Sequence, residues 1–566
     1  MEKIQKLYTE DGQNIPDIPW NVYPRPQMKR DSFLCLNGKW AFESTESQNK
    51  PDNFSKQITV PFSPETLLSE VGQSFDDNTY LWYEREFALP EGFKKDRVFL
   101  HFGAVDNTTT VFVNGKQVGS HFGGYDPFYF DITDYLKEEN TVTVRVQDIM
   151  QDRVYPYGKQ CRKRGGMWYT PTSGIWQTVW LESVNESYIK SLSVETKDSL
   201  VIIKAENVDK GTVKLNFDNN VLEYRMQNGI CTFEVENKKE WSPESPYLYY
   251  YTLETETDRV ESYFAFRTLE IKNIDGYERL CLNGKPYFFH GVLDQGYWSD
   301  GGLTPPSPNS YEKDILAMKS LGFNMLRKHI KIEPMQFYYD CDRLGMVVFQ
   351  DMINNGKYSF LRDTALPTIG FRHIKDTNFH KDKKTRQAFV ASMEKTVEML
   401  KSFSCICYWT IFNEGWGQFC GTEMYYKLKK LDKDRFIDTA SGWFSDVQSD
   451  VSSKHVYFRK IKLEAGNKPL VLSEFGGYSY RIKEHSFNLE KEYGYGKYDN
   501  REDFVKALCD LYENEVVPLV KNGLTASVYT QLSDVEDETN GLLTFDRRVM
   551  KVKPDEFLPI SEKLKI

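Results

Sequence analysis

The carboxyl-terminal half of the chain alternates strand-like and helical runs, and this alternation constrains the fold more than any other feature. From about residue 272 we count eight strand-like segments, several of them separated by stretches with helical periodicity. Such alternation is typical of parallel α/β architecture, and eight repeats over roughly 250 residues or more predict a (β/α)8 barrel. The segments are YFFHGVL (287–293), FNMLRKH (323–329), MVVFQD (346–351), ICYWTIFNE (406–414), RFIDTASG (435–442), KHVYF (454–458), PLVLSEFGG (469–477) and LTASVYTQLSD (524–534).

The clearest helical stretches between these segments are 311–322, 386–402 and 503–522. An open doubly wound sheet is the alternative architecture for such a pattern. We favour the barrel because no glycine-rich phosphate loop follows any of the predicted strands.

Two further regions precede the predicted barrel, and both are rich in strand-like runs. Residues 1–183 contain short alternating segments with Asn-Gly turns, which predict a layered β-sandwich. Residues 184–271 continue with strand-like runs and no long helical period, at a size that suits an immunoglobulin-like sandwich. We therefore predict three domains, with the barrel spanning residues 272–566.

The bulk composition narrows the range of partners and the compartment. The net charge of −10 argues against nucleic acid or an anionic membrane as the partner, since both attract basic patches. No apolar run approaches the ~20 residues of a membrane span, and the first twenty residues lack the apolar core of a secretion signal. The nine cysteines form no CxxC pair, which favours reduced thiols over a disulfide framework or a zinc site. We expect a cytoplasmic protein.

Two of the predicted barrel strands end in a glutamate. Glu414 ends the fourth strand-like segment, in the run WTIFNE, and Glu474, within VLSEFGG, ends the seventh. Active sites of such barrels lie at the carboxyl ends of the strands, and paired carboxylates suit glycoside hydrolysis. A single glutamate after an apolar strand is more often a surface or capping residue. Two of them on separate strands, each beside a glycine turn, favour a catalytic pair.

The residues around Glu414 suggest which of the two carboxyl groups is the general acid. Trp409, Phe412 and Trp416 are expected to disfavour its charged form, which suits a general acid. The neighbouring Asn413 is a candidate ligand for a sugar hydroxyl.

Several further segments carry a resemblance to a known family. The chain resembles glycoside hydrolase family 2, which contains β-galactosidases, β-glucuronidases and β-mannosidases, over nearly its whole length. The resemblance lies in YPRPQMKR (23–30), LNGKWAF (36–42), the long stretch 101–133, SGIWQTVWLE (173–182), FRTLEI (266–271), LNGKPYFFHGV (282–292) and the two glutamate motifs. It implies a jelly-roll, sugar-binding-like first domain before the immunoglobulin-like domain and the barrel.

The same resemblance implies roles for the two glutamates. Glu414 matches the general acid/base of the family, and Glu474 matches the nucleophile. The anomeric configuration would then be retained, no cofactor would be needed, and the two carboxyl groups are expected about 5–5.5 Å apart.

The chain also departs from the family pattern at places that bear on the substrate. The loop GVLDQGYWSDGGLTPPS (291–307) is unusual, and in LRKHIKIEP (326–334) Arg327 matches while His329 is shifted by one position. Glucuronidases of the family carry an Asn-x-Lys near the end of the barrel, but residues 534–548 are acidic and lysine-free. The metal ligands of large β-galactosidases lack counterparts after Asp351. We therefore predict neither a glucuronidase nor a metal site.

Other candidate substrate-binding residues lie at or near the ends of the predicted strands or in a first-domain loop expected to reach the barrel. For each of them, packing within the protein is the alternative role. The set is Asp294, Trp298, Arg327, His329, Asp351, Trp443, His455, Tyr457, Gln531 and Trp168. Among these, Tyr457 is expected to donate a hydrogen bond to the nucleophile and so keep it ionised.

The sequence as a whole predicts a retaining exo-β-glycosidase that acts on oligosaccharides or small glycosides with a neutral terminal sugar. A β-galactoside is the first expectation, and an α-L-arabinoside or a β-galactofuranoside is the alternative within the family. A non-catalytic carbohydrate-binding protein and an unrelated barrel lyase or isomerase are the rivals of other classes. The expected partner is the carbohydrate, with no nucleic acid and no membrane, and the sequence is compatible with a homo-oligomer.

Overall fold

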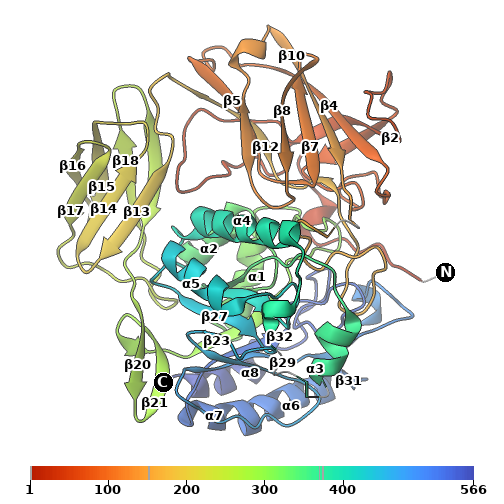
Figure 1. Cartoon of the computed structure of the whole chain (residues 1–566), viewed down its shortest axis with the longest axis vertical. Coiled ribbons are helices and arrows are strands. Elements are labelled where there is room, and N and C mark those ends of the chain that lie inside the picture. Colours follow the sequence, from red (N-terminus) through yellow and green to blue (C-terminus); the bar gives the residue numbers. More distant parts are fainter. Residues whose placement is uncertain (1–2, 151–152, 369, 372–374) are drawn as a thin grey trace.

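A computed structural model describes residues 3–150, 153–368, 370–371 and 375–566. The chain forms three bodies that follow one another in sequence (Figure 1). A β-sandwich drawn in orange lies at the top of the view, a smaller yellow-green sandwich lies at its side, and a green-to-blue barrel with its helices lies below both. The fold class predicted from the sequence is confirmed.

The first sandwich consists of two antiparallel sheets around an apolar core. Its core residues alternate along the strands, as in Val142, Val144 and Val146, which are all fully buried. One sheet has the order β3 (Lys56–Val60), β2 (Gly38–Thr45), β4 (Tyr80–Ala88), β10 (Glu139–Gln147), β7 (Thr108–Val113) and β8 (Lys116–Phe122). The other has the order β1 (Leu34–Cys35), β12 (Val179–Val184), β5 (Arg97–Phe102) and β9 (Phe128–Asp131), and β6 (Val105–Asp106) pairs with β11 (Gly174–Ile175).

The second sandwich is smaller and has its own apolar core, which includes Val201, Val213 and Tyr251. One sheet has the order β13 (Leu192–Lys197), β14 (Leu200–Ala205) and β17 (Ile230–Glu234). The other has the order β16 (Asn220–Met226), β15 (Gly211–Phe217), β18 (Tyr249–Glu254) and β19 (Arg259–Phe264). A short sheet of β20 (Leu269–Ile274), β21 (Tyr277–Leu282) and β22 (Lys285–Pro286) leads into the barrel.

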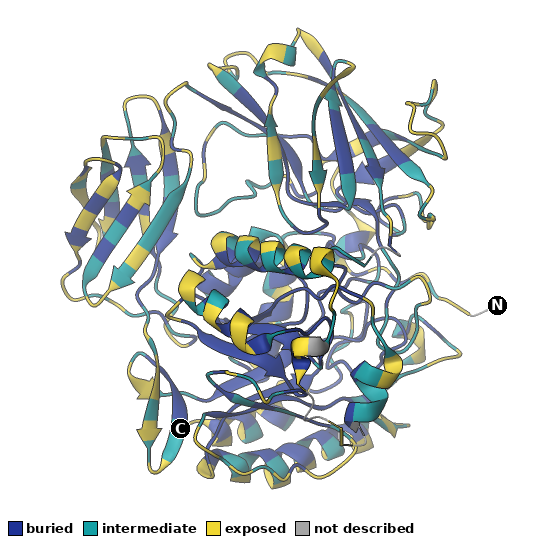
Figure 2. Cartoon of the chain, in the orientation of Figure 1, coloured by how far each residue is buried: buried dark blue, intermediate teal, exposed yellow. Residues whose placement is uncertain are grey.

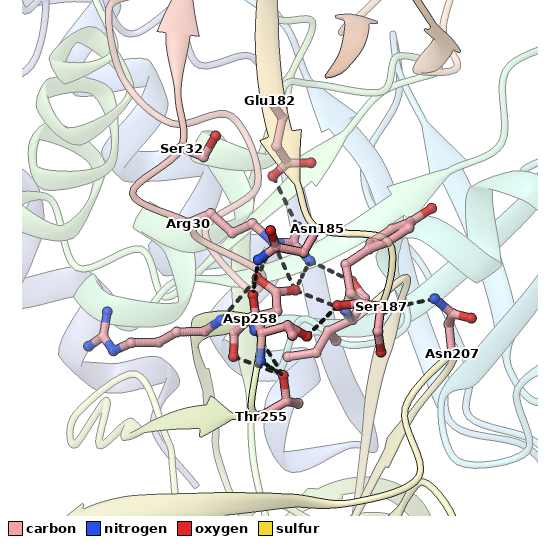
Figure 3. A network of polar contacts seen from close by, with 12 residues as sticks. Arg30, Ser32, Glu182, Asn185, Ser187, Asn207, Thr255 and Asp258 are labelled. Carbon is pink, nitrogen blue, oxygen red and sulfur yellow. Dashed lines mark hydrogen bonds and ion pairs between the residues drawn. The ribbon is translucent and has the colours of Figure 1, made fainter. Parts of the chain in front are cut away.

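A buried ionic network joins the two sandwiches (Figure 3). Arg30 donates two hydrogen bonds from Nε and Nη2 to the carboxylate of Asp258, which precedes β19, at 3.1 and 2.8 Å. Its Nη1 donates to Oε1 of Glu182 on β12 at 3.0 Å. All three side chains are buried, so the planar guanidinium satisfies two carboxylates that would otherwise be costly to desolvate.

The barrel consists of eight parallel strands, and each predicted strand segment overlaps one of them. Along the sheet the order is β27 (Phe436–Ser441), β26 (Ile406–Asn413), β25 (Val347–Asp351), β24 (Met325–Lys328), β23 (Phe289–Asp294), β32 (Leu524–Thr530), β29 (Leu470–Gly476) and β28 (Ser452–Val456). The two end strands, β27 and β28, meet through a hydrogen bond of 3.1 Å between the hydroxyls of Ser441 and Ser453. This contact closes the ring, so the carboxyl ends of all eight strands surround one opening.

Helices surround the barrel strands, and all three predicted helical stretches are helical. The helices are α1 (Asn309–Ser320), α2 (Met335–Leu344), α3 (Leu366–Thr368), α4 (Lys383–Leu400), α5 (Gly421–Leu431), α6 (Arg501–Leu511), α7 (Val517–Lys521) and α8 (Pro554–Ser561). A π-helical turn, Tyr512–Val516, joins α6 to α7. The carboxylate of Asp382 accepts a hydrogen bond from the backbone N–H of Thr385 and caps α4.

Burial follows the layers of the barrel. Figure 2 shows α4 and α5 with exposed residues on their outer faces and the strands beneath them buried. Every residue of β26 and β29 is buried, as expected for parallel strands covered on both sides. In the described part of the chain, no helix has the length and apolar character needed to cross a membrane.

Candidate active site

Glu414 stands on a left-handed turn that directly follows β26. Its φ is +50°, and the next residues, Gly415 and Gly417, have φ of +77° and +68°. A left-handed backbone costs a residue other than glycine about 1–2 kcal/mol. A Cβ on Gly415 would lie 2.5 Å from the ring of Phe444. The glycines that follow this strand therefore permit the turn, which leaves the Glu414 side chain 13% exposed at the barrel opening.

Glu474 lies on β29, three strands around the ring from β26, which precedes Glu414. Its Oε2 accepts a hydrogen bond of 2.8 Å from the hydroxyl of Tyr457, and its Oε1 accepts one of 3.1 Å from Nη1 of Arg327. The side chain is 8% exposed. Both oxygens are thus held in place while the carboxylate keeps some access from the opening.

The two glutamates converge. The Nδ1 of His455 on β28 is hydrogen-bonded to Oε1 of Glu414 at 2.9 Å and lies 3.5 Å from Oε2 of Glu474. One carboxylate oxygen of each glutamate and a ring nitrogen of His455 lie within 4.8 Å of one another. Three such atoms are also a conceivable metal site. In this structure His455 Nδ1 is hydrogen-bonded to Glu414, and Glu474 Oε2 accepts a hydrogen bond from Tyr457.

Arg327 connects three of the strand ends. Its guanidinium donates to Oδ1 of Asp351 at 3.0 Å and to Oδ1 of Asn413 at 2.9 Å, in addition to Glu474. The arginine is 1% exposed, and a fork of five donors suits this bridging position. Because the side-chain oxygen of Asn413 accepts from Arg327, its side-chain amide nitrogen is the group that remains to bind a hydroxyl of a sugar.

His329 and Asp351 form a second buried pair near the opening. The Nδ1 of His329 is hydrogen-bonded to Oδ2 of Asp351 at 2.9 Å. Burial lowers the pKa of His329 to about 4, although Asp351 opposes this effect. The imidazole is therefore neutral at neutral pH, and its Nε2 forms no hydrogen bond with the described residues.

The charged surroundings of Glu474 favour its ionised form. Burial alone would raise the pKa of this carboxyl group, but His455, Arg327 and further groups outweigh it, so the pKa lies below the usual value. The hydrogen bond from Tyr457 acts in the same direction. A nucleophilic carboxylate needs this state, because only the ionised form attacks.

Replacing Tyr457 with phenylalanine is expected to move the acidic limb of the pH profile of kcat/KM to higher pH. With Glu474 as the predicted nucleophile, activity should fall as the pH drops through its pKa, and the variant loses one interaction that lowers this pKa. The measurement is kcat/KM on an aryl glycoside between about pH 4 and pH 9. An acidic limb at the wild-type position would show that Tyr457 does not affect the pKa of Glu474.

Two predicted ligands, Asp294 at the end of β23 and Trp298 in the loop that follows, contact other parts of the protein. Nζ of Lys328 lies 2.6 Å from Oδ2 of Asp294, and the backbone N–H of Gly296 donates to Oδ1 at 2.9 Å. The guanidinium of Arg547 stacks over the ring of Trp298, with its Cζ 4.1 Å from the centroid of that ring. Asp294 and Trp298 are 5% and 4% exposed. Both side chains therefore have partners within the protein. Contact with the substrate stays a prediction for both.

The first-domain loop that carries Trp168 contacts the barrel opening. The indole of Trp168 stacks on Trp416, with ring centroids 5.4 Å apart, and meets Tyr358 edge-on at 5.0 Å. The same loop is hydrogen-bonded to the barrel at Tyr157, whose hydroxyl donates to the carbonyl of Gly356 at 2.9 Å. Trp443, after β27, is 8% exposed.

Two of the aromatic residues expected beside Glu414 lie elsewhere. Nε1 of Trp409 donates to Asp432, which follows α5, and Phe412 stacks on Phe389 of α4. Both side chains therefore face the helices outside the barrel. The sequence reasoning placed them by proximity along the chain, whereas the strand directs them away from the opening.

Four residues near the opening were not singled out from the sequence: Lys159, Glu538, Asn540 and Tyr495. Glu538 and Asn540 accept hydrogen bonds from Nε2 of Gln531, the residue after β32, at 3.3 and 2.9 Å. Tyr495 stacks on Tyr457 with ring centroids 3.8 Å apart. The acidic run DVEDETN was noticed only for its charge, and no local signal pointed to Lys159.

Comparison with known families accounts for all three bodies. The models "Glycosyl hydrolases family 2, sugar binding domain", "Glycosyl hydrolases family 2" and "Glycosyl hydrolases family 2, TIM barrel domain" match residues 57–184, 182–267 and 271–549. The chain belongs to glycosyl hydrolases family 2. The resemblance noted from the sequence is thereby confirmed, and the strands that carry Glu414 and Glu474 lie in the segment matched by the TIM barrel model.

Relatives within family 2 differ in the sugar named for them. A β-galactosidase of Thermoanaerobacter pseudethanolicus is 26% identical over 492 residues, covering 81% of this chain and 61% of that protein. The human β-glucuronidase is 25% identical over 499 residues, covering 77% of this chain and 72% of that protein. The chain thus spans less than two thirds of the length of the first relative, and the comparisons leave the terminal sugar open.

Solved structures of other glycosidases share the fold. A β-glucuronidase of an uncultured Clostridium species superposes with a TM-score of 0.72 at 19% identity, covering 96% of this chain and 99% of that one. A β-galacturonidase of Eisenbergiella tayi superposes with a TM-score of 0.67 at 19% identity, covering 95% and 98%. At such identities the likeness concerns the arrangement of the three domains.

Proposed function

We propose that this chain is a retaining exo-β-glycosidase that removes a terminal neutral sugar from oligosaccharides or small glycosides. One observation carries the proposal. Glu414 and Glu474, from strands β26 and β29, bring carboxylate oxygens within 4.8 Å of each other at the barrel opening. Retaining enzymes hold their carboxyl groups ≈ 5–5.5 Å apart, whereas inverting enzymes leave ≈ 6.5–9.5 Å for a water molecule.

The reaction follows from this pair. In the first step Glu414 donates its proton to the glycosidic oxygen, while Glu474 attacks the anomeric carbon and forms a glycosyl ester as the bond to the leaving group breaks. In the second step Glu414, now a carboxylate, takes a proton from water, whose oxygen displaces Glu474. Two inversions give net retention. His455 contacts both carboxyl groups and is placed to orient them throughout.

The surroundings of the pair support an exo-acting site and a neutral sugar. The loop that carries Trp168 lies against the rim of the barrel and narrows the approach to the glutamates. Glu538, buried near the end of β32, would repel a uronate carboxylate. A β-galactoside is our first assignment, in keeping with the Thermoanaerobacter relative. An α-L-arabinoside or a β-galactofuranoside is the alternative, because L-arabinose shares much of the stereochemistry of galactose.

We also propose that the protein acts in the cytoplasm. All nine cysteines are free thiols in the structure, and six of them are buried. Buried thiols without disulfides suit a reducing compartment.

A screen of 4-nitrophenyl glycosides, followed by proton NMR of the first product, tests the proposed function. We expect turnover of a galactoside, an arabinoside or a galactofuranoside, with little activity on the glucuronide and the mannoside. The sugar released first should have the anomeric configuration of the substrate. Initial release of the opposite anomer would contradict the double displacement. Binding without any turnover would support a non-catalytic carbohydrate-binding protein.

A further inference from the structure

Two oppositely charged side chains from different domains approach the same side of the barrel opening. Lys159 lies in the first-domain loop between β10 and β11, and Glu538 follows β32 of the barrel. They are separated by more than three hundred residues in the sequence. Both are buried, with 6% and 3% of their surface exposed.

The ammonium group of Lys159 has an unusual environment for a buried charge. Its Nζ lies 5.2 Å from the ring centroid of Trp416 and 5.8 Å from that of Tyr169. Within the described residues it forms neither a hydrogen bond nor an ion pair with a side chain. The other deeply buried lysines near the barrel differ, since Lys328 and Lys551 contact the carboxylates of Asp294 and Asp534 at 2.6 Å. Among the described residues, the ammonium of Lys159 is thus left without an ionic partner beside the opening, where its three N–H donors are available to a ligand.

Glu538 is the anionic counterpart. Its Oε2 accepts hydrogen bonds from the hydroxyl of Tyr169 and from Nε2 of Gln531, while Oε1 has no hydrogen bond with the described residues. Burial raises the pKa of this carboxyl group, and the charge of Lys159 opposes the rise. The two side chains therefore influence each other electrostatically although no direct ion pair joins them.

Unsatisfied polar atoms surround the same place. Gln531 is bonded to Gln295 and Asn540, and each of these neighbours keeps one buried atom without a partner among the described residues: the acceptor Oε1 of Gln295 and the donor Nδ2 of Asn540. Buried polar atoms are rarely left unpaired without a reason. A set that offers both donors and acceptors matches hydroxyl groups, which donate and accept, better than a carboxylate, which only accepts.

This polar group lies close to the catalytic pair. Glu538 interacts electrostatically with Glu474, and Lys159 interacts with His329. The contacts place them together as well. Lys159 lies against Trp416, two residues from Glu414, and against Tyr169, which donates to Glu538. Tyr495, which interacts with Glu538, stacks on Tyr457, the hydrogen-bond donor to Glu474. A sugar whose anomeric carbon lies between Glu414 and Glu474 would therefore direct its other hydroxyls toward Lys159 and Glu538.

We propose that Lys159 and Glu538 form a clamp across two domains that binds hydroxyl groups of the terminal sugar and selects a neutral sugar against a uronate. Lys159 donates to a hydroxyl oxygen, and Glu538 accepts from a hydroxyl hydrogen. The charges of the two side chains balance, whereas a substrate carboxylate would add a negative charge beside Glu538 and Glu474. This inference rests on the proposed function and specifies its substrate class.

The test measures kcat/KM of Lys159→Met and Glu538→Gln on a matched pair of aryl glycosides. The first pair is 4-nitrophenyl β-D-galactopyranoside and 4-nitrophenyl β-D-galacturonide. If the screen selects another neutral sugar that has a uronic counterpart, that sugar and its counterpart replace them. We expect the wild type to prefer the neutral sugar at least ~10²-fold, and each variant to lose ~10–10²-fold on it, because a buried polar group is left unpaired. The double variant should lose less than the product of the single losses.

Matched variants separate binding from folding. Lys163→Met removes an exposed lysine from the same loop and should leave kcat/KM unchanged. Lys159→Gln keeps a donor without the charge and should restore part of the activity of Lys159→Met. Thermal melting of each variant identifies any that fails to fold, in which case Glu538→Gln and Lys159→Gln carry the test.

Two results would overturn the clamp. The first is wild-type kcat/KM on the neutral sugar in both Lys159→Met and Glu538→Gln. The second is a wild-type preference for the uronide that disappears in Lys159→Met, which would make Lys159 a ligand of a substrate carboxylate. A preference for the uronide would also contradict the neutral sugar of the proposed function, whereas failure of the proposed hydrolysis itself looks different. In that case the wild type hydrolyses none of the glycosides, and a 2-deoxy-2-fluoro-β-D-galactosyl inactivator does not label Glu474.

Discussion

The Glu474→Ala variant is expected to lose at least ~10³-fold in kcat on every aryl glycoside that the wild type hydrolyses, because no group remains to form the covalent intermediate. The side chain lies between Tyr457 and Arg327, which hold its oxygens in place and favour the ionised state. Alanine removes the carboxylate and leaves room for a small nucleophile beside the anomeric carbon.

Azide provides the positive control for this variant. Azide is expected to enter the vacated space and restore turnover, giving a glycosyl azide of inverted configuration that NMR identifies. Azide then attacks the anomeric carbon in place of Glu474, while Glu414 still protonates the leaving group. Wild-type activity in Glu474→Ala would remove Glu474 from the mechanism. Rescue with retention would show that another residue forms the covalent intermediate.

The Glu414→Ala variant is expected to respond to the leaving group. General acid catalysis contributes typically 10²–10⁴-fold, and it matters most where the leaving oxygen is a poor one. The variant should therefore lose ~10²–10⁴-fold in kcat/KM on an alkyl glycoside and far less on a 2,4-dinitrophenyl glycoside, whose leaving group departs without a proton.

The measurement compares the two leaving groups on the same sugar. A plot of log kcat/KM against leaving-group pKa should be steep for Glu414→Ala and shallower for the wild type. Gln418→Ala, in the same turn but with its Nε2 bonded to Asp376 and to the carbonyl of Phe444, serves as a control for disturbance of the turn. Equal losses on both substrates in Glu414→Ala would contradict the acid role.

Much of the fold was predictable because it depends on local patterns. Each barrel strand is an apolar run, such as the run that ends at Asn413, followed by a turn residue and a helical period. These signals arise from neighbours in the chain, so a single sequence contains them. The positions of Glu414 and Glu474 were predictable for the same reason, since parallel strands of a barrel end on one face.

The orientation of side chains near those positions was not predictable from proximity. Trp409 is five residues from Glu414 but faces Asp432 behind the barrel, and Asp294 ends a barrel strand but is engaged with Lys328. Which way a side chain points depends on the twist and closure of the whole sheet, and which partner it meets depends on neighbouring strands.

The sequence by itself determined that this chain has a barrel with two glutamates at the carboxyl ends of its strands, because apolar periodicity and turn residues act over a few neighbours. Only the tertiary structure decided what surrounds them. A search for a lysine in residues 534–548 found none, yet the packing of the first domain on the barrel brings Lys159 to the same opening as Glu538. Such a meeting depends on the docking of two separately folded bodies, and no local pattern along the chain encodes it.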